Sequence, residues 1–234
     1  MKFQGEVKQL WCYPVKSLLG ESRTELAIDR RGVVGDRWFA ISNKRGKFGS
    51  GKNTRRFRKI DGLFNFQAKY DNKTLLIVFP DGRTFEANDP NLNRELSSAL
   101  GQPVTLVSEN NISHFDADSL HLITTSSLNW LRNLLPNSNI DERRFRPNLS
   151  IATPEPGLVE HDWIGKTFLI GDELTVEITG LTQRCIMVNM AQEELECDRH
   201  ILRKISKQSN NNFGVYAKVI RLGIIRVGDT VSCL

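Results

Sequence analysis

The chain has 234 residues, 39% hydrophobic and 25% charged, so it is long enough for one large globular domain or two smaller ones. No apolar run has the length of a signal peptide or a membrane span, so we expect a cytoplasmic protein without a membrane partner. The four cysteines, Cys12, Cys185, Cys197 and Cys233, are scattered without a CxxC or zinc spacing, which argues against a disulfide framework and a zinc site.

The positive charge is concentrated in the first half of the chain. Residues 1–110 carry 19 Lys/Arg and 12 Asp/Glu, a net charge of +7, whereas residues 111–234 carry 13 and 15, a net charge of −2. Residues 44–59, KRGKFGSGKNTRRFRK, hold eight basic side chains and no acid. Such a cluster attracts phosphate on a small cofactor or on a nucleic acid, but it is also typical of a solvated basic loop.

The predicted elements of the first half are mostly β. Alternating apolar residues, Pro-Asp-Gly turns and an Asp-Pro helix start define them. In chain order we expect a strand at 5–12, a hairpin with its first strand at 37–42 and its turn at 43–46, a hairpin at 73–88, a helix at 89–101 and a strand at 103–109.

The second half alternates short strands with two predicted helices. We expect the first helix to be capped by Thr125 or Ser126, because leucines follow at helical spacing. In chain order the expected elements are a strand at 120–124, a helix at 125–135, a strand at 148–153, a strand pair at 167–185, a helix at 193–208 and β structure at 213–234. Many short strands with few helices predict a mainly β fold of the β-barrel type.

The segment ITGLTQRCIMVNM, residues 178–190, places Arg184 directly before Cys185. A neighbouring cation lowers the pKa of a thiol and favours a nucleophilic or metal-ligating thiolate. Neighbours on a strand point to opposite faces, however, so a packed cysteine beside a surface arginine is the competing interpretation.

Several other segments have side chains suited to phosphate. Lys16 and Ser17 follow a strand that ends at a proline, and Arg37 lies in a Gly-Asp-Arg turn. Each could equally belong to an ordinary solvated turn.

DERRFRPN, residues 141–148, is denser in arginine. Strand alternation would place Arg144 and Arg146 on one face, ahead of Asn148, which suits a phosphate and an amide edge. The alternative is a basic rim paired with Asp141 and Glu142. In NNFGVY, Gly214 predicts a close approach by another backbone or a ligand, to which Tyr216 could offer its hydroxyl.

Five segments occur in the order and at roughly the spacing found in one protein family, and together they cover nearly the whole chain. They are YPVKSL (13–18), GVVGDRWFAI (32–41), RRFRPNLSI (143–151), TQRC (182–185) and FGVYAKVIRLGIIRVGDTV (213–231). The chain thus resembles the MOSC-domain proteins (molybdenum cofactor sulfurase C-terminal domain), in the branch of the mitochondrial amidoxime-reducing component and its bacterial relatives. This resemblance implies an N-terminal MOSC-associated β-barrel domain at residues 1–115 and a MOSC β-barrel domain at residues 116–234.

The resemblance also implies a molybdenum cofactor (molybdopterin), a pterin dithiolene with a terminal phosphate. Cys185 occupies the position of the family's molybdenum-ligating cysteine, and a soft thiolate suits this metal. The implied cofactor contacts are Lys16, Ser17, Arg37, Thr125, Ser126, Arg146, Asn148, Arg184 and Tyr216. Lys52 and Arg56 of the basic segment are expected to rim the phosphate end.

Two departures from the family pattern concern the substrate side and the electron supply. Gln183 replaces the usual Ser or Thr, and the common DP-x-TG after the cysteine is absent; the loop here contains MAQEELECD. The chain has no cysteine cluster for a [2Fe–2S] centre, so electrons would come from a separate protein.

The activity implied by the resemblance is reduction of small N-hydroxylated compounds, such as hydroxylamines and N-hydroxylated bases, to amines. A separate iron–sulfur or flavin reductase would supply the electrons. The alternative in the same family is a sulfur carrier, in which Cys185 accepts a persulfide from a pyridoxal-phosphate-dependent desulfurase. A nucleic-acid-binding barrel is disfavoured, because only Phe48 and Phe57 interleave the basic residues.

Overall fold

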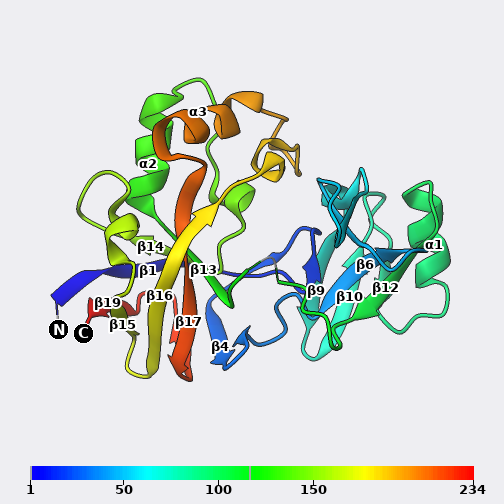
Figure 1. Ribbon diagram of the computed structural model, residues 1–234. Helices are drawn as coiled ribbons and strands as arrows, with labels where there is room; N and C mark the ends of the chain where they lie inside the picture. The colour runs from blue at the N-terminus through cyan, green and yellow to red at the C-terminus, as the bar shows by residue number, and fades with distance from the viewer. Residues whose placement is uncertain (1, 116) are drawn as a thin grey trace. The chain divides into compact units, whose positions relative to one another are not determined.

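The computed structural model describes residues 2–115 and 117–234, which form two compact units (Figure 1). The described residues of unit 1 are 2–11, 22–34 and 117–234, and those of unit 2 are 12–21 and 35–115. The first two segments of unit 1 lie before the predicted domain boundary after residue 115. They belong to unit 1 because their strands pair with strands from the second half of the chain. The compact units are therefore interleaved along the chain, and the division into domains 1–115 and 116–234 stays a prediction.

A closed seven-stranded barrel forms the centre of unit 1. Its strand order is β14-β13-β17-β16-β15-β19-β1, and β1 pairs with β14 to close the barrel. The prediction of a mainly β, barrel-type fold with few helices is confirmed. The barrel strands are β1 (Lys2–Cys12), β13 (Leu120–Thr124), β14 (Leu149–Ala152), β15 (Thr167–Ile170), β16 (Leu174–Gln183), β17 (Asn212–Arg221) and β19 (Thr230–Cys233).

Helices cover one side of β13 and β17. Helix α2 (Thr125–Leu134) and helix α3 (Arg199–Ser209) lie near each other beside these strands (Figure 1). A buried apolar cluster joins them to the barrel, because leucines and isoleucines recur at helical spacing on their inner faces. The cluster consists of Ile123, Leu128, Leu131, Ile140, Phe145, Val188, Ile201, Ile205 and Phe213.

The cap of α2 and the start of α3 differ from the predictions. The cap of α2 is Thr124, whose side chain accepts a hydrogen bond from the Ser127 amide, and not Thr125 or Ser126. Helix α3 starts at Arg199 after the cap Asp198, so the predicted start at residue 193 is wrong. The residues before it form a loop with a bridge between Gln192 and Leu195.

The remaining elements of unit 1 are short. Three 3-10 helices are η2 (Glu142–Phe145), η3 (Val159–Trp163) and η4 (Ile186–Asn189). A small sheet has the order β18-β4-β5, from β18 (Gly223–Arg226), β4 (Glu25–Asp29) and β5 (Gly32–Val33). Strand β3 (Glu21–Arg23) lies where the chain returns from unit 2 to unit 1.

Unit 2 consists of two sheets around its own core. The first has the order β12-β6-β7-β8, with β2 parallel to β6, and the second has the order β11-β10-β9. The core contains Val15, Ile41, Phe66, Ile77 and Leu96 among others. The elements are β2 (Val15–Lys16), β6 (Phe39–Asn43), β7 (Phe48–Ser50), β8 (Phe57–Lys59), η1 (Leu63–Asn65), β9 (Gln67–Asp71), β10 (Thr74–Val78), β11 (Thr84–Glu86), α1 (Leu92–Ala99) and β12 (Val104–Ser108).

No helix in the described part of the chain combines the length and the apolar character needed to cross a bilayer.

A fully buried carboxylate, that of Glu160 in η3, fastens the start of α2. It accepts hydrogen bonds from Thr124 Oγ1 at 2.7 Å and from Ser127 Oγ at 2.6 Å, and also from the backbone of Gly214 in β17. Burial raises the pKa of Glu160, although these hydrogen bonds partly oppose the shift. Glu160 thus connects η3, α2 and β17 through one buried group.

We predict that Glu160→Ala lowers the free energy of unfolding by about 3 kcal/mol, because buried donors on three elements lose their acceptor. Urea denaturation measures this change, and Glu155→Ala, on the exposed face of the neighbouring loop, is the control, with a change within about 0.5 kcal/mol. Equal effects of the two substitutions would contradict the prediction.

The pH dependence gives a second test of Glu160. Because its pKa is raised in the folded state, the native protein binds the proton more tightly than the unfolded chain does. The Glu160 contribution to the free energy of unfolding should therefore fall as pH rises from the ordinary pKa of 4.5 to the raised value. This decline should be missing in Glu160→Gln, and an unchanged pH profile in that variant would refute the assignment.

Candidate functional site

Three of the predicted site residues have left-handed backbones. Their φ angles are 65° at Ser17, 52° at Arg37 and 55° at Arg146. A side chain makes this conformation costly by roughly 1–2 kcal/mol, and such residues gather at functional sites. Among the described residues the other non-glycine cases are Asn72, Glu193, Asn210 and Asn211. Asparagine tolerates this region, which leaves the two arginines, the serine and Glu193. Arg146 takes this conformation where it ends the 3-10 helix η2.

In unit 2, Lys16 and Ser17 are buried, with 3% and 4% of their surfaces exposed. The alternative of a solvated turn is therefore wrong for these two residues. Lys16 lies on β2, and its Nζ donates a hydrogen bond to the carbonyl oxygen of His114 at 2.9 Å. The same ammonium lies 4.6 Å from the centre of the Phe57 ring. A buried ammonium held by a carbonyl and a ring keeps its positive charge at a defined point.

Arg37 is placed by three groups of unit 2. Its guanidinium pairs with the fully buried Asp36, whose other oxygen accepts a hydrogen bond from the Tyr13 amide at 2.7 Å. The guanidinium also lies 5.2 Å from the centre of the Tyr13 ring. The Arg37 carbonyl oxygen lies 3.0 Å from Nδ1 of His114. The His114 ring is itself 1% exposed.

The basic segment places two further cations near Lys16. Lys52 Nζ and Arg56 Cζ lie 5.8 and 5.3 Å from the centre of the Phe57 ring, which Lys16 also contacts. Arg56 also donates hydrogen bonds to the carbonyl oxygens of Ser113 and Phe115, on either side of His114. Three cations around one ring repel each other, so an anion would be favoured beside them.

In unit 1, the arginine-rich segment forms the 3-10 helix η2, so the predicted strand alternation of Arg144 and Arg146 is wrong. Arg146 ends this helix in the left-handed conformation. Arg144 is 2% exposed and donates hydrogen bonds to three carbonyl oxygens, those of Asn139, Met190 and Glu196. Burial lowers the pKa of its guanidinium.

Arg143 forms ion pairs, and the pairing with Asp141 is the one that the alternative of a paired basic rim expects. Its guanidinium contacts Asp141 at 2.9 Å and Glu193 and Glu194 at 2.5 Å. Hydrogen bonds to Asp141 and Glu194 raise its pKa. Arg143 and Arg144 thereby fasten the loop that follows Cys185 to η2.

Asn148 is fully buried and bridges two strands. Its Oδ1 accepts a hydrogen bond from the His121 amide at 3.2 Å, and its Nδ2 donates to the Trp11 carbonyl at 3.4 Å. Its backbone amide and carbonyl also bond to His121 and Trp11, at 2.8 and 2.9 Å. The side chain predicted to contact the cofactor is thus also a structural bridge.

Cys185 follows β16 and caps the 3-10 helix η4, with its side chain half-buried. The Arg184 guanidinium donates hydrogen bonds to the carbonyl oxygen of Phe145 and, at 3.2 Å, to Nε2 of His121. It also lies 5.5 Å from the centre of the Phe145 ring. These contacts place the Arg184 cation on the His121 side of the turn.

His121 is the central side chain of this group in unit 1 and is 5% exposed. Its Nδ1 lies 3.2 Å from the Arg146 carbonyl oxygen, and its ring lies 5.8 Å from that of Tyr216, its partner across β13 and β17. A Cβ on Gly214 would come within 2.7 Å of His121 Nε2 and of β13. The predicted close approach of another backbone at Gly214 is therefore confirmed by the Leu122 carbonyl oxygen, 2.7 Å from that Cβ position, and the His121 ring is a second neighbour.

Thr125 and Ser126 contact a different loop. Thr125 Oγ1 accepts a hydrogen bond from the Thr153 amide at 3.3 Å. Ser126 Oγ lies 2.7 Å from Thr153 Oγ1 and also bonds to the carbonyl oxygen of Glu155. Among the described hydrogen bonds, none joins these two hydroxyls to His121 or Arg184, and their contact with a cofactor stays a prediction.

The sequence analysis missed three polar residues, which are His114 of unit 2 and His121 and Thr182 of unit 1. His114 and His121 have no local signal, because the arginine carbonyls that they contact lie 77 and 25 positions away. Thr182 is 2% exposed, and its hydroxyl has no hydrogen-bond partner within residues 2–115 and 117–234. A buried hydroxyl without a partner is uncommon, and three residues before Cys185 it is consistent with an additional ligand.

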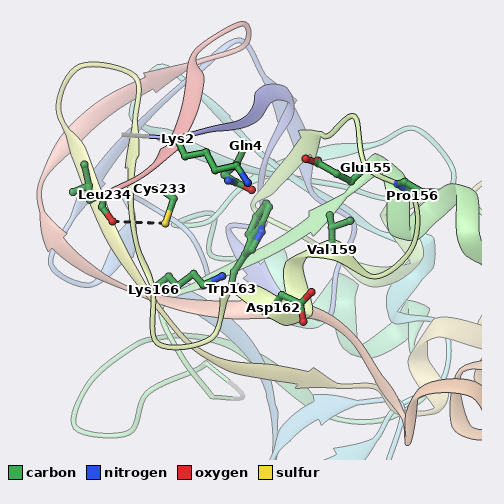
Figure 2. Close-up of a pocket in the computed structure, with 10 residues that line it drawn as sticks. All are labelled: Lys2, Gln4, Glu155, Pro156, Val159, Asp162, Trp163, Lys166, Cys233 and Leu234. Carbon is green, nitrogen blue, oxygen red and sulfur yellow. Dashed lines mark hydrogen bonds between the residues drawn. The ribbon is translucent and has the colours of Figure 1, made fainter.

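A separate cavity of about 770 Å³ in unit 1 contains none of the predicted site residues (Figure 2). Its charged side chains are Lys2, Lys166, Glu155 and Asp162, two of each sign. Trp163 also lines the cavity (Figure 2). Cys233, another lining residue, donates a hydrogen bond from its thiol to the Leu234 carbonyl oxygen. Balanced charges do not favour a polyanionic cofactor, so this cavity does not fit the predicted ligand.

Known proteins match this chain in family and in fold. Residues 103–232 match the model of the MOSC domain, and residues 4–121 match that of the MOSC N-terminal beta barrel domain. No curated protein sequence matches the chain.

Solved structures add a likeness of fold. The crystal structure of the YUAD protein from Bacillus subtilis is similar with a TM-score of 0.50 and 12% identity, over 97% of this chain and 94% of that chain. YiiM from Geobacillus stearothermophilus and YiiM from Escherichia coli each give a TM-score of 0.38, at 18% and 16% identity, over 50% of this chain and 54% of theirs. With each of the two family models covering half of the sequence or more, this chain belongs to the MOSC-domain family.

Proposed function

We propose that this chain binds a molybdenum cofactor and reduces small N-hydroxylated compounds, such as hydroxylamines and N-hydroxylated bases, to amines. The observation that supports the proposal is that three residues predicted to contact the cofactor have strained backbones. Ser17, Arg37 and Arg146, selected from the sequence as cofactor contacts, are three of the four described left-handed residues that are neither glycine nor asparagine, and Glu193 is the fourth. A left-handed residue next to a right-handed one turns successive backbone amides toward the same side, and such local concavities bind anions.

The donors in each unit have the chemistry that a part of the cofactor requires. Cys185 would supply a soft thiolate ligand to molybdenum, for which its half-buried position leaves access. Lys16, Ser17 and Arg37 would hold the phosphate, with Lys52 and Arg56 adding positive charge. The buried Thr182 hydroxyl, without a partner in the described structure, offers one more polar contact. Arg146, Asn148, Arg184, Tyr216, Thr125 and Ser126 complete the proposed set.

When bound, the molybdenum centre would supply the two-electron chemistry that N–O reduction requires. The residues of this chain would hold it, balance its negative charge and limit access of water to it. A separate iron–sulfur or flavin protein would deliver the electrons. The branch of the mitochondrial amidoxime-reducing component is the family group in which we place this activity.

A second candidate function in the same family is sulfur transfer. Its support is the partial exposure of Cys185 at the end of a strand, where a persulfide could be received and released. In that case the chain would bind a pyridoxal-phosphate-dependent desulfurase. The two functions differ in metal content and in the mass of the purified protein.

We predict close to one molybdenum per chain after expression in a host that makes the cofactor, and at least about a tenfold loss in Cys185→Ala. Elemental analysis measures the ratio. Cys197→Ala, which removes an exposed thiol, is the control and should keep its metal. A metal-free wild-type chain carrying one added sulfur on Cys185 would overturn the proposed reductase function and favour sulfur transfer.

We also predict that Ser17→Gly has opposite effects on folding stability and on cofactor binding. Glycine relieves the left-handed strain, so the free energy of unfolding should stay equal or rise by about 1 kcal/mol, while the molybdenum content falls. Urea denaturation and elemental analysis measure the two effects.

Asn72→Gly is the control for this experiment, since Asn72 is a left-handed residue in the turn between β9 and β10. It should retain the full molybdenum content. A Ser17→Gly protein with unchanged metal would remove Ser17 from the site.

A further inference from the structure

The two left-handed arginines share one feature that no motif indicates. In unit 2, Nδ1 of His114 lies 3.0 Å from the Arg37 carbonyl oxygen, and in unit 1, Nδ1 of His121 lies 3.2 Å from the Arg146 carbonyl oxygen. Both rings are more than nine-tenths buried. The other two histidines, His161 and His200, are less buried. The same ring atom thus meets the same backbone group at both strained arginines.

Donor and acceptor rules determine the protonation of these rings. A carbonyl oxygen only accepts hydrogen bonds, so Nδ1 of His114 and of His121 must carry the hydrogen. The Arg184 guanidinium only donates, so Nε2 of His121 must accept. His121 is therefore the neutral Nδ1–H tautomer, with both ring nitrogens engaged.

Each histidine is itself fixed by its surroundings. The His114 amide donates to Glu109 Oε2 at 2.7 Å, and its ring packs edge-on to Phe48 with 4.7 Å between centres. The His121 amide donates to Asn148 Oδ1, and its ring fills the space that a Cβ on Gly214 would occupy. Rigid histidines can therefore define the direction of the arginine backbones.

We propose that His114 and His121 are positioning residues, which hold Arg37 and Arg146 in the left-handed conformation through Nδ1–H···O=C hydrogen bonds and thereby preorganise each arginine, within its own unit, for anion binding. The role in cofactor binding rests on the proposed function, whereas the hydrogen bonds do not. His121 also accepts a hydrogen bond from the guanidinium of Arg184, the residue that precedes Cys185. Such preorganisation lowers the cost of ordering the site when the ligand binds.

The first test is independent of any cofactor. In ¹⁵N-histidine-labelled protein, ring ¹⁵N shifts should show the Nδ1–H tautomer for both His114 and His121. The exposed His200 should show the mixture typical of a histidine in water. Finding Nδ1 without a hydrogen on either ring would overturn the proposal for that residue.

The second test uses substitutions that keep or remove the donor. Asparagine places its Nδ2–H close to where Nδ1–H stands, whereas leucine fills the volume without a donor. Amide hydrogen exchange at Arg37 should be about tenfold faster in His114→Leu and near wild type in His114→Asn. His121→Leu should act in the same way on Arg146, and His200→Leu should change neither amide.

The third measurement concerns the ligand, with molybdenum per chain as the readout. Both leucine variants should lose most of the metal, His114→Asn should recover it, and His121→Asn should recover it only in part because Arg184 has lost its acceptor. Equal losses for asparagine and leucine would indicate a packing role and refute positioning. A wild-type chain without molybdenum would refute the proposed function, and the tautomer and exchange results would then decide the histidine proposal alone.

Discussion

The hydrogen bonds of Asn148 are the constraint on which the site in unit 1 depends. Strand β14 begins one residue later, at Leu149, and the barrel closes where β14 pairs with β1. Asn148 extends this strand pairing by one residue before β14 starts. Its backbone forms hydrogen bonds with Trp11 on one side and with His121 on the other. Its side-chain amide repeats both contacts, to the Trp11 carbonyl and the His121 amide. A buried residue with four such bonds holds β1 and β13 at a fixed separation.

The geometry around Cys185 follows from these hydrogen bonds. Asn148 fixes the His121 backbone, and the His121 ring in turn meets Arg146 and Arg184. Gly214 in β17 has no Cβ, and this leaves the space for the ring. The β16–β17 ladder is irregular between Leu181 and Gln183, opposite Gly214, and such bulges redirect side chains next to active sites. Barrel closure and the position of the Arg184 guanidinium are therefore linked through few side chains.

Local patterns in the sequence predicted much of the fold, because strands, Pro-Asp-Gly turns and helix periodicity depend on neighbouring residues. The hairpin of β10 and β11 and the helices α1 and α2 occur where they were expected. The misses have tertiary causes. The sequence predicted strand alternation for Arg144 and Arg146. Arg144 instead lies in η2, where its guanidinium donates hydrogen bonds to the carbonyl oxygens of Met190 and Glu196. The roles of His114 and His121 depend on carbonyl groups distant in the chain, and no spacing rule reveals them.

The loop after Cys185 departs from the family sequence, and the structure gives a physical reason why it can still be ordered. Glu193 and Glu194 form ion pairs with Arg143, and the buried Arg144 bonds to carbonyl oxygens at both ends of the loop. Both arginines belong to η2, the helix that Arg146 terminates. The acidic residues of the loop therefore match the basic residues of this chain's own η2. The loop is held by the same 3-10 helix that ends at Arg146, so substitutions in η2 should also alter the loop, and the two segments should be considered together.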